Sequence, residues 1–231
     1  MERKGSHPGS AVRRREILRA ALACFAEIGF SQTTMADIRR RAKASTGSIY
    51  HQFESKEHLA AEVYLEGIAD YQVGWIAALE GETDAREGIR TVIAHHLKWV
   101  RSNEAWARYL FQRRHSVFTA AAERKLAESN AELVRRASRW FGVHVEAGRL
   151  RRLPPDIYIA LLAGPYLEHT RHSLSGRGST ECEQAIVMLA DAAWRSLAVH
   201  PEPPHGPRPR PGSATRKQGK PRARKDRKSV V

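Results

Sequence analysis

The stretch TMADIRRRAKASTGSIYHQF, residues 34–53, decides the fold of the N-terminal part of this chain. It carries two groups of apolar side chains, each with the spacing of one helix face, on either side of a short turn. These side chains are Met35, Ile38, Ala42, Ile49 and Phe53. Thr34 and Asp37 have the spacing of a capping box, which predicts that the first helix begins there. Two short helices joined by such a turn have helix-turn-helix spacing.

The face that the second of these helices leaves exposed has the composition of a DNA-reading surface. Once Ile49 and Phe53 are buried, this face presents short or planar hydrogen-bonding groups and no carboxylate: Thr46, Gly47, Ser48, Tyr50 and His51. Small side chains allow a helix to approach the floor of the major groove, where base edges are readable. The cations around this face are Arg39, Arg40, Arg41, Lys43 and Lys56.

Helical periodicity continues over the rest of the chain. A helix is predicted from about Val12 to Ile28, ending at Gly29, and Ser55 is placed to cap a long fourth helix. Further helices are predicted near 84–102, 104–115, 119–147, 155–174 and 180–198. Prolines are absent between residues 9 and 153, and no long alternating pattern indicates a strand. We therefore expect an all-α protein of about nine helices.

Three stretches within a span of about 50 residues resemble the N-terminal domain of TetR-type (tetracycline-repressor-like) transcriptional regulators. They are RREILRAALACFAEIGF at 14–30, SQTTMADI at 31–38 and STGSIYHQFESKEHL at 45–59. The resemblance implies a sequence-specific DNA-binding regulator, a repressor by family default, whose partner is a double-stranded DNA operator. It also implies that Thr46, Gly47 and Ser48 meet base edges, beside Ser45 at the start of that helix. Tyr50 and His51 then contact phosphate or a nearby base, and Thr33 and Lys56 hold the DNA backbone on either side.

The turn departs from the family pattern. Where such proteins usually have Gly then Val, this chain has Lys43 and Ala44. The turn thereby loses a conformationally permissive residue and part of a buried contact. Lys43 either gains a phosphate contact or leaves the turn looser.

The resemblance also implies a domain organisation. We expect a flexible basic arm over residues 1–11, a helix-turn-helix DNA-binding domain over 12–58, a helical ligand-binding and dimerisation domain over 59–199, and a disordered basic tail over 200–231. In the family, an effector of low molecular weight binds the second domain and re-angles the first through the fourth helix. The effector of this chain is unknown from its sequence.

Aromatic side chains in the second domain are the candidates for a ligand pocket. They are Trp99, Trp106, Tyr109, Phe118, Trp140, Tyr158 and Tyr166. Such groups line apolar pockets and offer a few polar atoms, but aromatics at helical spacing also form plain core. The last two helices carry apolar residues on more than one face, around 157–167 and 185–197, which favours a homodimer built through them as a four-helix interface.

Charge is concentrated at the two ends of the chain. The net charge is +14 overall, with +5 over residues 1–60, +1 over 61–199 and +8 over 200–231. Residues 201–228 lack every large apolar side chain, so nothing offsets the entropy of ordering them. This tail adds non-specific DNA affinity or serves only solubility. The alternative function is an architectural or nonspecific nucleic-acid-binding protein driven by these basic ends.

Several other classes are disfavoured by the sequence. No apolar stretch indicates a signal peptide or a membrane span, so we expect a cytoplasmic protein associated with the bacterial nucleoid. Phosphate-binding glycine loops, nucleophile elbows and zinc-protease histidine pairs are missing, so we expect no enzyme and no cofactor. The pair His169 and His172 lacks further ligands at characteristic spacing, so we expect no metal site.

Overall fold

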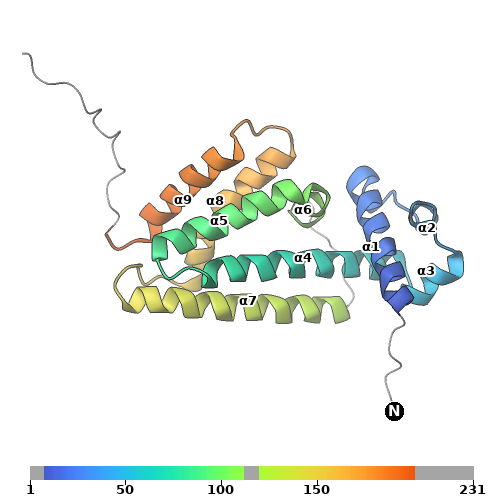
Figure 1. Cartoon of the computed structure of the whole chain (residues 1–231), viewed down its shortest axis with the longest axis horizontal. Coiled ribbons are helices and arrows are strands. Elements are labelled where there is room, and N and C mark those ends of the chain that lie inside the picture. Colours follow the sequence, from blue (N-terminus) through green and yellow to red (C-terminus); the bar gives the residue numbers. More distant parts are fainter. Residues whose placement is uncertain (1–7, 112–119, 201–231) are drawn as a thin grey trace, which may run out of the picture. The chain divides into compact units, whose positions relative to one another are not determined.

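The computed structural model describes residues 8–111 and 120–200, and within them it contains nine helices. The helices are α1 Pro8–Ile28, α2 Met35–Ala42, α3 Thr46–Gln52, α4 Lys56–Glu80, α5 Ala85–Ser102, α6 Glu104–Phe111, α7 Ala120–Glu146, α8 Pro155–Leu174 and α9 Cys182–Leu197 (Figure 1). Extended pairing in these residues is limited to one isolated antiparallel bridge between Leu150 and Ala198. The predicted all-α class is confirmed.

Several helix ends lie where local chemistry predicts. The Thr34 hydroxyl accepts from the amide of Asp37 at 3.2 Å, and the Asp37 carboxylate accepts from the amide of Thr34 at 3.0 Å, so the predicted capping box is present. The Ser55 hydroxyl accepts from the amide of His58 at 3.0 Å and caps α4. Gly29 follows α1 with a φ of 84°, which glycine adopts without a side-chain clash. The predictions for the sixth and seventh helices extend into residues 112–119, outside the described residues.

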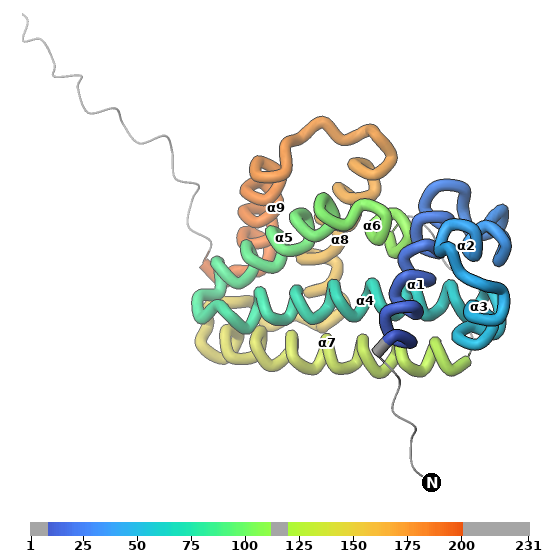
Figure 2. Tube along the Cα trace, turned by 45° about the vertical axis from the view of Figure 1, so that its right-hand side comes forward, coloured from blue at the N-terminus to red at the C-terminus, as the bar shows by residue number. Residues whose placement is uncertain are grey.

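The three N-terminal helices share one hydrophobic core with the start of α4. Large side chains of this core that are nearly or fully buried include Ile17, Leu18, Phe25, Ile38, Ile49, Phe53, Leu59 and Val63. The two helices of the helix-turn-helix are short, and each buries only one or two large residues in this core. Their position therefore depends on α1 and α4, which gather with them in Figure 2.

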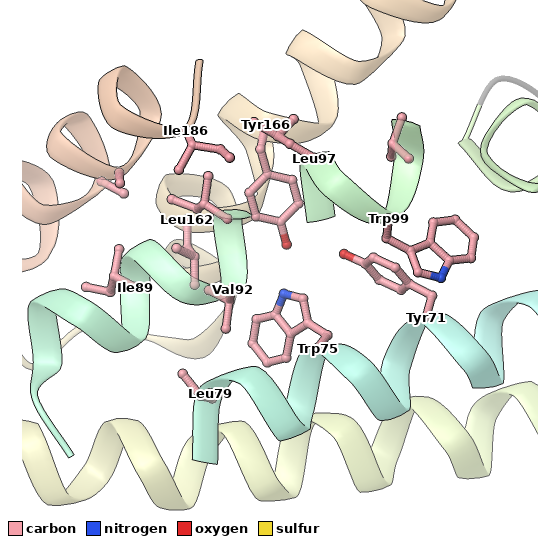
Figure 3. Packing of buried hydrophobic residues seen from close by; sticks show 14 of the residues in the cluster. Tyr71, Trp75, Leu79, Ile89, Val92, Leu97, Trp99, Leu162, Tyr166 and Ile186 are labelled. Carbon is pink, nitrogen blue, oxygen red and sulfur yellow. The ribbon is translucent and has the colours of Figure 1, made fainter. Parts of the chain in front are cut away.

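A second core lies around the later part of α4. Here α4 lies alongside α7, and α5, α8 and α9 complete the surroundings (Figure 1). Members of this core include Tyr71, Trp75, Leu79, Ile89, Val92, Leu162, Tyr166 and Ile186, as shown in Figure 3. One continuous helix thus contributes to both cores.

Helix α6 adds a second connection between the two cores. The Tyr109 hydroxyl donates to the carbonyl of Ala60 at 2.9 Å, and its ring stacks on Phe25 with centroids 5.6 Å apart. Trp106, one turn of helix away, packs against both cores and covers Gly67 of α4. The approach is close enough that α4 requires a residue without a side chain at this point.

The basic tail lies almost wholly outside the described residues, and so does the expected N-terminal arm up to residue 7. Residues 8–11, predicted as part of that arm, instead form the first turn of α1, which begins at Pro8 and not near Val12. Within residues 8–111 and 120–200, no helix is both long and apolar enough to cross a membrane.

A substitution at Gly67 tests the contact between α4 and α6. A Cβ at this position would lie 2.3 Å from the ring of Trp106, so Gly67→Leu should lower the free energy of unfolding by about 1–3 kcal/mol. The measurement is urea unfolding followed by circular dichroism. Gly142→Ala on α7 is the control, because a Cβ there meets no atom within 4 Å, and it should be neutral or raise stability by about 0.5–1 kcal/mol. Equal stability of Gly67→Leu and the wild type would show that the contact is not tight.

Candidate DNA-binding surface and ligand cavity

Helix α3 is held by its apolar side and leaves its polar side exposed. Ile49 and Phe53 are fully buried against α1 and α4, whereas Thr46, Gly47 and His51 are exposed and Tyr50 has 52% of its surface exposed. The exposed groups are those that the sequence singled out. They include neutral donors and acceptors but no carboxylate, which suits a surface that approaches phosphate and base edges.

Two serines near the start of α3 differ in role. The Ser45 hydroxyl accepts from the amide of Ser48 at 3.1 Å and so caps the helix. Its side chain is therefore used in holding α3 together, which the sequence did not separate from a DNA contact. Ser48 is partly exposed, and a Cβ on the neighbouring Gly47 would meet no atom within 4 Å. The start of α3 is thus narrow and open on one side.

Thr33 and Lys56 were expected to face outward and hold the DNA backbone, but the structure places both side chains against the loop that follows α1. Thr33 is only 1% exposed, and its hydroxyl donates to the carbonyl of Gly29 at 2.7 Å. The ammonium group of Lys56 donates to the carbonyls of Phe30 at 3.0 Å and Thr33 at 2.9 Å. These bonds satisfy carbonyls left over after the end of α1. The expected side-chain contact of Thr33 with DNA is therefore corrected to a structural role, and Lys56 is partly committed to the same loop.

Lys43 occupies a left-handed backbone conformation in the turn. Its φ is 49° and its ψ is 40°, and its amide donates to the end of α2. A residue with a Cβ in this region costs about 1–2 kcal/mol, which the glycine usual at this position in the family avoids. The turn therefore keeps the left-handed backbone conformation that a glycine would adopt there. The side chain of Lys43 is exposed beside α3.

The cations around α3 are not equivalent. Arg40 pairs with Asp37, and Arg41 forms two bonds to the Glu27 carboxylate at 2.6 and 2.7 Å. In the described part of the chain, Arg39 and Lys43 have no acidic partner and are exposed. These two side chains are therefore the most available for phosphate.

A cavity of about 400 Å³ lies between α4, α7, α8 and the segment before α8. This size falls in the range of about 300–1,000 Å³ typical of small-molecule sites. Its walls are mainly apolar and aromatic, and the aromatic members are Tyr71, Trp75, Phe141, Tyr158 and Tyr166. Of the residues predicted to line a pocket, Tyr158 and Tyr166 do so.

Four of the other predicted pocket residues do not line this cavity. The polar atoms of three of them are used elsewhere: Trp99 donates to Asp70 at 2.8 Å, Tyr109 to Ala60 and Trp140 to the carbonyl of Glu82 at 2.8 Å. Trp106 covers Gly67. These aromatics join helices instead of lining the space. Phe118 lies outside the described residues.

The sequence missed Tyr71 and Trp75 as cavity residues. Tyr71 and Trp75 lie on the apolar stripe of α4, which indicated core packing only. They are indeed buried, and they also form one side of the cavity. Their residue type gave no indication that they line a cavity. The signal available in the sequence was their position on the long fourth helix, which also contributes to the N-terminal core.

A buried polar chain runs behind the cavity. The Tyr71 hydroxyl lies 2.9 Å from Nδ1 of His96, and Nε2 of His96 lies 2.7 Å from the Thr170 hydroxyl. His96 is fully buried, and this burial, with the neighbouring His95 and His169, lowers its pKa to about 3. The imidazole is therefore neutral, and one ring nitrogen donates while the other accepts.

Comparisons with known proteins agree with the exposed α3 and its supporting helices. Residues 17–63 match the sequence model of the bacterial regulatory proteins of the tetR family. The HTH-type transcriptional repressor KstR2 of Rhodococcus jostii (strain RHA1) is 34% identical over 144 residues, which are 61% of this chain and 67% of that protein. KstR2 of Mycolicibacterium smegmatis is 42% identical over 69 residues, covering 30% of this chain and 32% of its own length.

Solved structures show the same fold. A TetR family transcription regulator from Marinobacter aquaeolei VT8 has a TM-score of 0.68 at 19% identity, with 82% of this chain and 97% of that chain covered. The fatty acid degradation regulator FadR from Bacillus halodurans has a TM-score of 0.69 at 17% identity, with 83% and 97% covered. The matched family model and the KstR2 relative define a helix-turn-helix DNA-binding transcriptional regulator. The chain belongs to the TetR family.

The neutral state of His96 predicts a pH dependence of stability. Between pH 6.5 and about 3 the unfolded chain binds a proton at this residue and the folded chain does not, so the contribution of His96 to stability is fully present above pH 6.5 and is lost as the pH decreases toward 3. The loss is about 1.4 kcal/mol per pH unit at its steepest. His96→Gln keeps polar atoms at this position without a titrating group and should lack this part of the dependence in urea unfolding.

The His96→Gln variant is needed because three other histidines change stability with pH in the same direction. His95, His144 and His169 also have lowered pKa values, caused mainly by burial. An identical pH dependence in the wild type and His96→Gln would show that His96 is not a neutral buried group.

Proposed function

We propose that this regulator is a homodimeric repressor that binds a two-fold symmetric DNA operator and is released when a small molecule occupies the cavity. The observation that carries the proposal is the path of α4. Its first turns belong to the core beneath α3, and its later residues Tyr71 and Trp75 line the cavity. The relatives' names support repression, because KstR2 is a transcriptional repressor. Such a protein acts on the chromosome in the cytoplasm.

In this proposal α3 enters the major groove with its open side. Thr46, Gly47 and Ser48 meet base edges, and Tyr50 and His51 reach phosphate or an adjacent base. Lys43, exposed beside α3 and without an acidic partner in the described residues, contacts a phosphate. Ser45 contributes through the cap that fixes the helix start. Paired recognition helices of a dimer then read two half-sites in neighbouring major grooves.

An exposed apolar surface on α8 and α9 supports dimerisation. Val187 and Met188 on α9 are 65% and 60% exposed, and Ile159 on α8 is 55% exposed. Large apolar side chains gathered on two adjacent helices at this exposure indicate an interface. A second copy of the same two helices would complete a four-helix arrangement about a two-fold axis.

A polar contact on α7 supports coupling between the cavity and the DNA-binding helices. Glu62 of α4 pairs with Arg14 of α1 and with Lys125 of α7, the latter at 3.3 Å. The same α7 forms a wall of the cavity at residues 133–146. A ligand that displaces α7 or α4 therefore acts on groups that also hold α1, and a small change in the cavity alters the spacing of the two recognition helices.

Replacement of Gly47 tests the docking of α3. Gly47→Leu should reduce operator affinity at least ~100-fold, because a bulky side chain holds the helix away from base contacts worth about 1–3 kcal/mol each. The fold should survive, since no atom lies within 4 Å of a Cβ at this position. The measurement is a gel shift with the DNA flanking the protein's own gene, in the presence of competitor DNA. Gly47→Ala should give an intermediate loss.

Two results would contradict this assignment. One is operator affinity that Gly47→Leu leaves unchanged, and the other is wild-type binding that competitor DNA of unrelated sequence removes as readily as operator DNA.

A charge on α9 tests the dimer. Val187→Glu should raise the dimer dissociation constant ~100-fold or more, because an unpaired charge buried in an interface costs roughly 3–5 kcal/mol. Size-exclusion chromatography with light scattering measures the change. Val73→Glu is the matched control, since Val73 is 71% exposed and belongs to α4, not to either helix of the proposed interface. The interface must lie elsewhere if the Val73→Glu control is monomeric, or if the Val187→Glu protein stays dimeric.

A further inference from the structure

The polar side chains in the inner wall of the cavity are already bonded within the protein. Figure 3 shows the Tyr71 hydroxyl and the Trp75 indole nitrogen of α4 pointing toward the Tyr166 hydroxyl of α8, which accepts a hydrogen bond from each. The Tyr158 hydroxyl donates to the carbonyl of Arg151. Each of these four polar groups thus has a partner in the protein, and a polar atom of a ligand would have to compete with a bond that is already formed.

The rest of the inner wall is hydrocarbon. Apart from these four residues, every described lining residue that is buried or partly buried is a glycine or has a side chain without polar atoms. A charged group placed here would lose its hydration without gaining an opposite charge, and a neutral polar group would lose hydrogen bonds to water. The interior therefore favours apolar surface over both.

The opening of the cavity favours neither sign of charge. Glu146 and Arg152 are the charged side chains among the described lining residues, and both are exposed. An ionic group of a ligand at the opening would therefore be attracted by one of them and repelled by the other, in contact with water that screens both effects. Three further exposed lining residues have hydrocarbon side chains, namely Val134, Pro155 and Ile159.

Helix α7 contains a glycine at the cavity that packing within the protein does not require. Gly142 lies inside this helix, where glycine is less favourable than alanine by roughly 0.5–1 kcal/mol. A Cβ at Gly142 would meet no atom within 4 Å, whereas a Cβ at Gly67 or Gly88 would lie 2.3 Å from a tryptophan ring. Gly142 lines the cavity, so the free space beside it is part of that cavity.

From these observations we propose that the effector is an uncharged, mainly hydrocarbon molecule that packs against the backbone of α7 at Gly142. This inference rests on the proposed function, since it assumes that the effector occupies this cavity. It extends that function by naming the chemical class of the effector and its contact on α7. Burial of apolar surface provides the affinity, and the missing side chain at Gly142 provides room for a close approach to the helix.

Alkylbenzenes and their charged counterparts test the chemical class. Butylbenzene is compared with 4-phenylbutanoate and 4-phenylbutylammonium, which have the same ring and a four-carbon chain that ends in a charge. Isothermal titration with the full chain as titrant, at neutral pH, should show that butylbenzene binds at least ~10-fold more tightly than either, because each charge must lose its hydration or keep the chain end outside the cavity. From ethylbenzene through propylbenzene to butylbenzene the affinity should rise about fourfold per methylene.

A pair of neighbouring variants on α7 tests the contact at Gly142. Gly142→Phe places a ring in the free space and should weaken butylbenzene about tenfold or more, because less apolar surface of the probe is then buried. The fold should survive, since a Cβ at Gly142 meets no atom and phenylalanine is a better helix former than glycine. Val143→Phe is the matched control, because Val143 is 57% exposed and does not line the cavity, and it should leave the affinity unchanged.

The proposal is overturned if either charged probe binds as tightly as butylbenzene, if longer chains bring no gain, if the two variants behave alike, or if no probe binds. Gel shifts with operator DNA on the same samples separate these failures from failure of the proposed function. If the charged probes release the operator and butylbenzene does not, the proposed function stands and the ligand class fails. If the probes bind in the expected order but leave the operator complex intact, the ligand class stands and the proposed release from DNA fails.

Discussion

Helix α4 is the element on which the rest of the structure depends, because it belongs to both hydrophobic cores. Leu59 and Val63 lie in the core beneath α3, and Tyr71, Trp75 and Leu79 lie in the second core. With a rise of about 1.5 Å per residue the helix spans roughly 37 Å. It has no internal proline, is capped by Ser55 and forms one continuous rod from Lys56 to Glu80. A displacement at its later residues therefore reaches the helices that hold α3, without any flexible joint in between.

Polar contacts between α4 and α7 make this rod sensitive to its neighbour. Gln72 donates to Asn130 at 2.7 Å and accepts from Ser129, and Glu62 pairs with Lys125 of the same helix. Such contacts have defined geometry and lose their energy over small displacements, whereas apolar contacts tolerate sliding. Helix α4, which contributes Tyr71 and Trp75 to the cavity wall, thus pairs with α1 on one side and with α7, which contributes more of that wall, on the other. In the proposed function, cavity occupancy and DNA-binding geometry therefore depend on the same interactions, which is the condition for coupling between them.

Local chemistry made the helices predictable, whereas the cavity depended on tertiary contacts. Thr34, Ser55 and Gly29 determine helix ends through atoms within a few residues, so their roles were evident from the sequence. Trp99 and Trp140 have the same residue type as Trp75 and similar helical surroundings, but their N–H groups pair with Asp70 and Glu82. Those partners are 29 and 58 residues away in sequence. Helical periodicity identifies such aromatic residues as buried, but it does not indicate which of them lines a cavity. Thr33 shows the same limit at the DNA surface, since its burial follows from the carbonyl that α1 leaves unpaired.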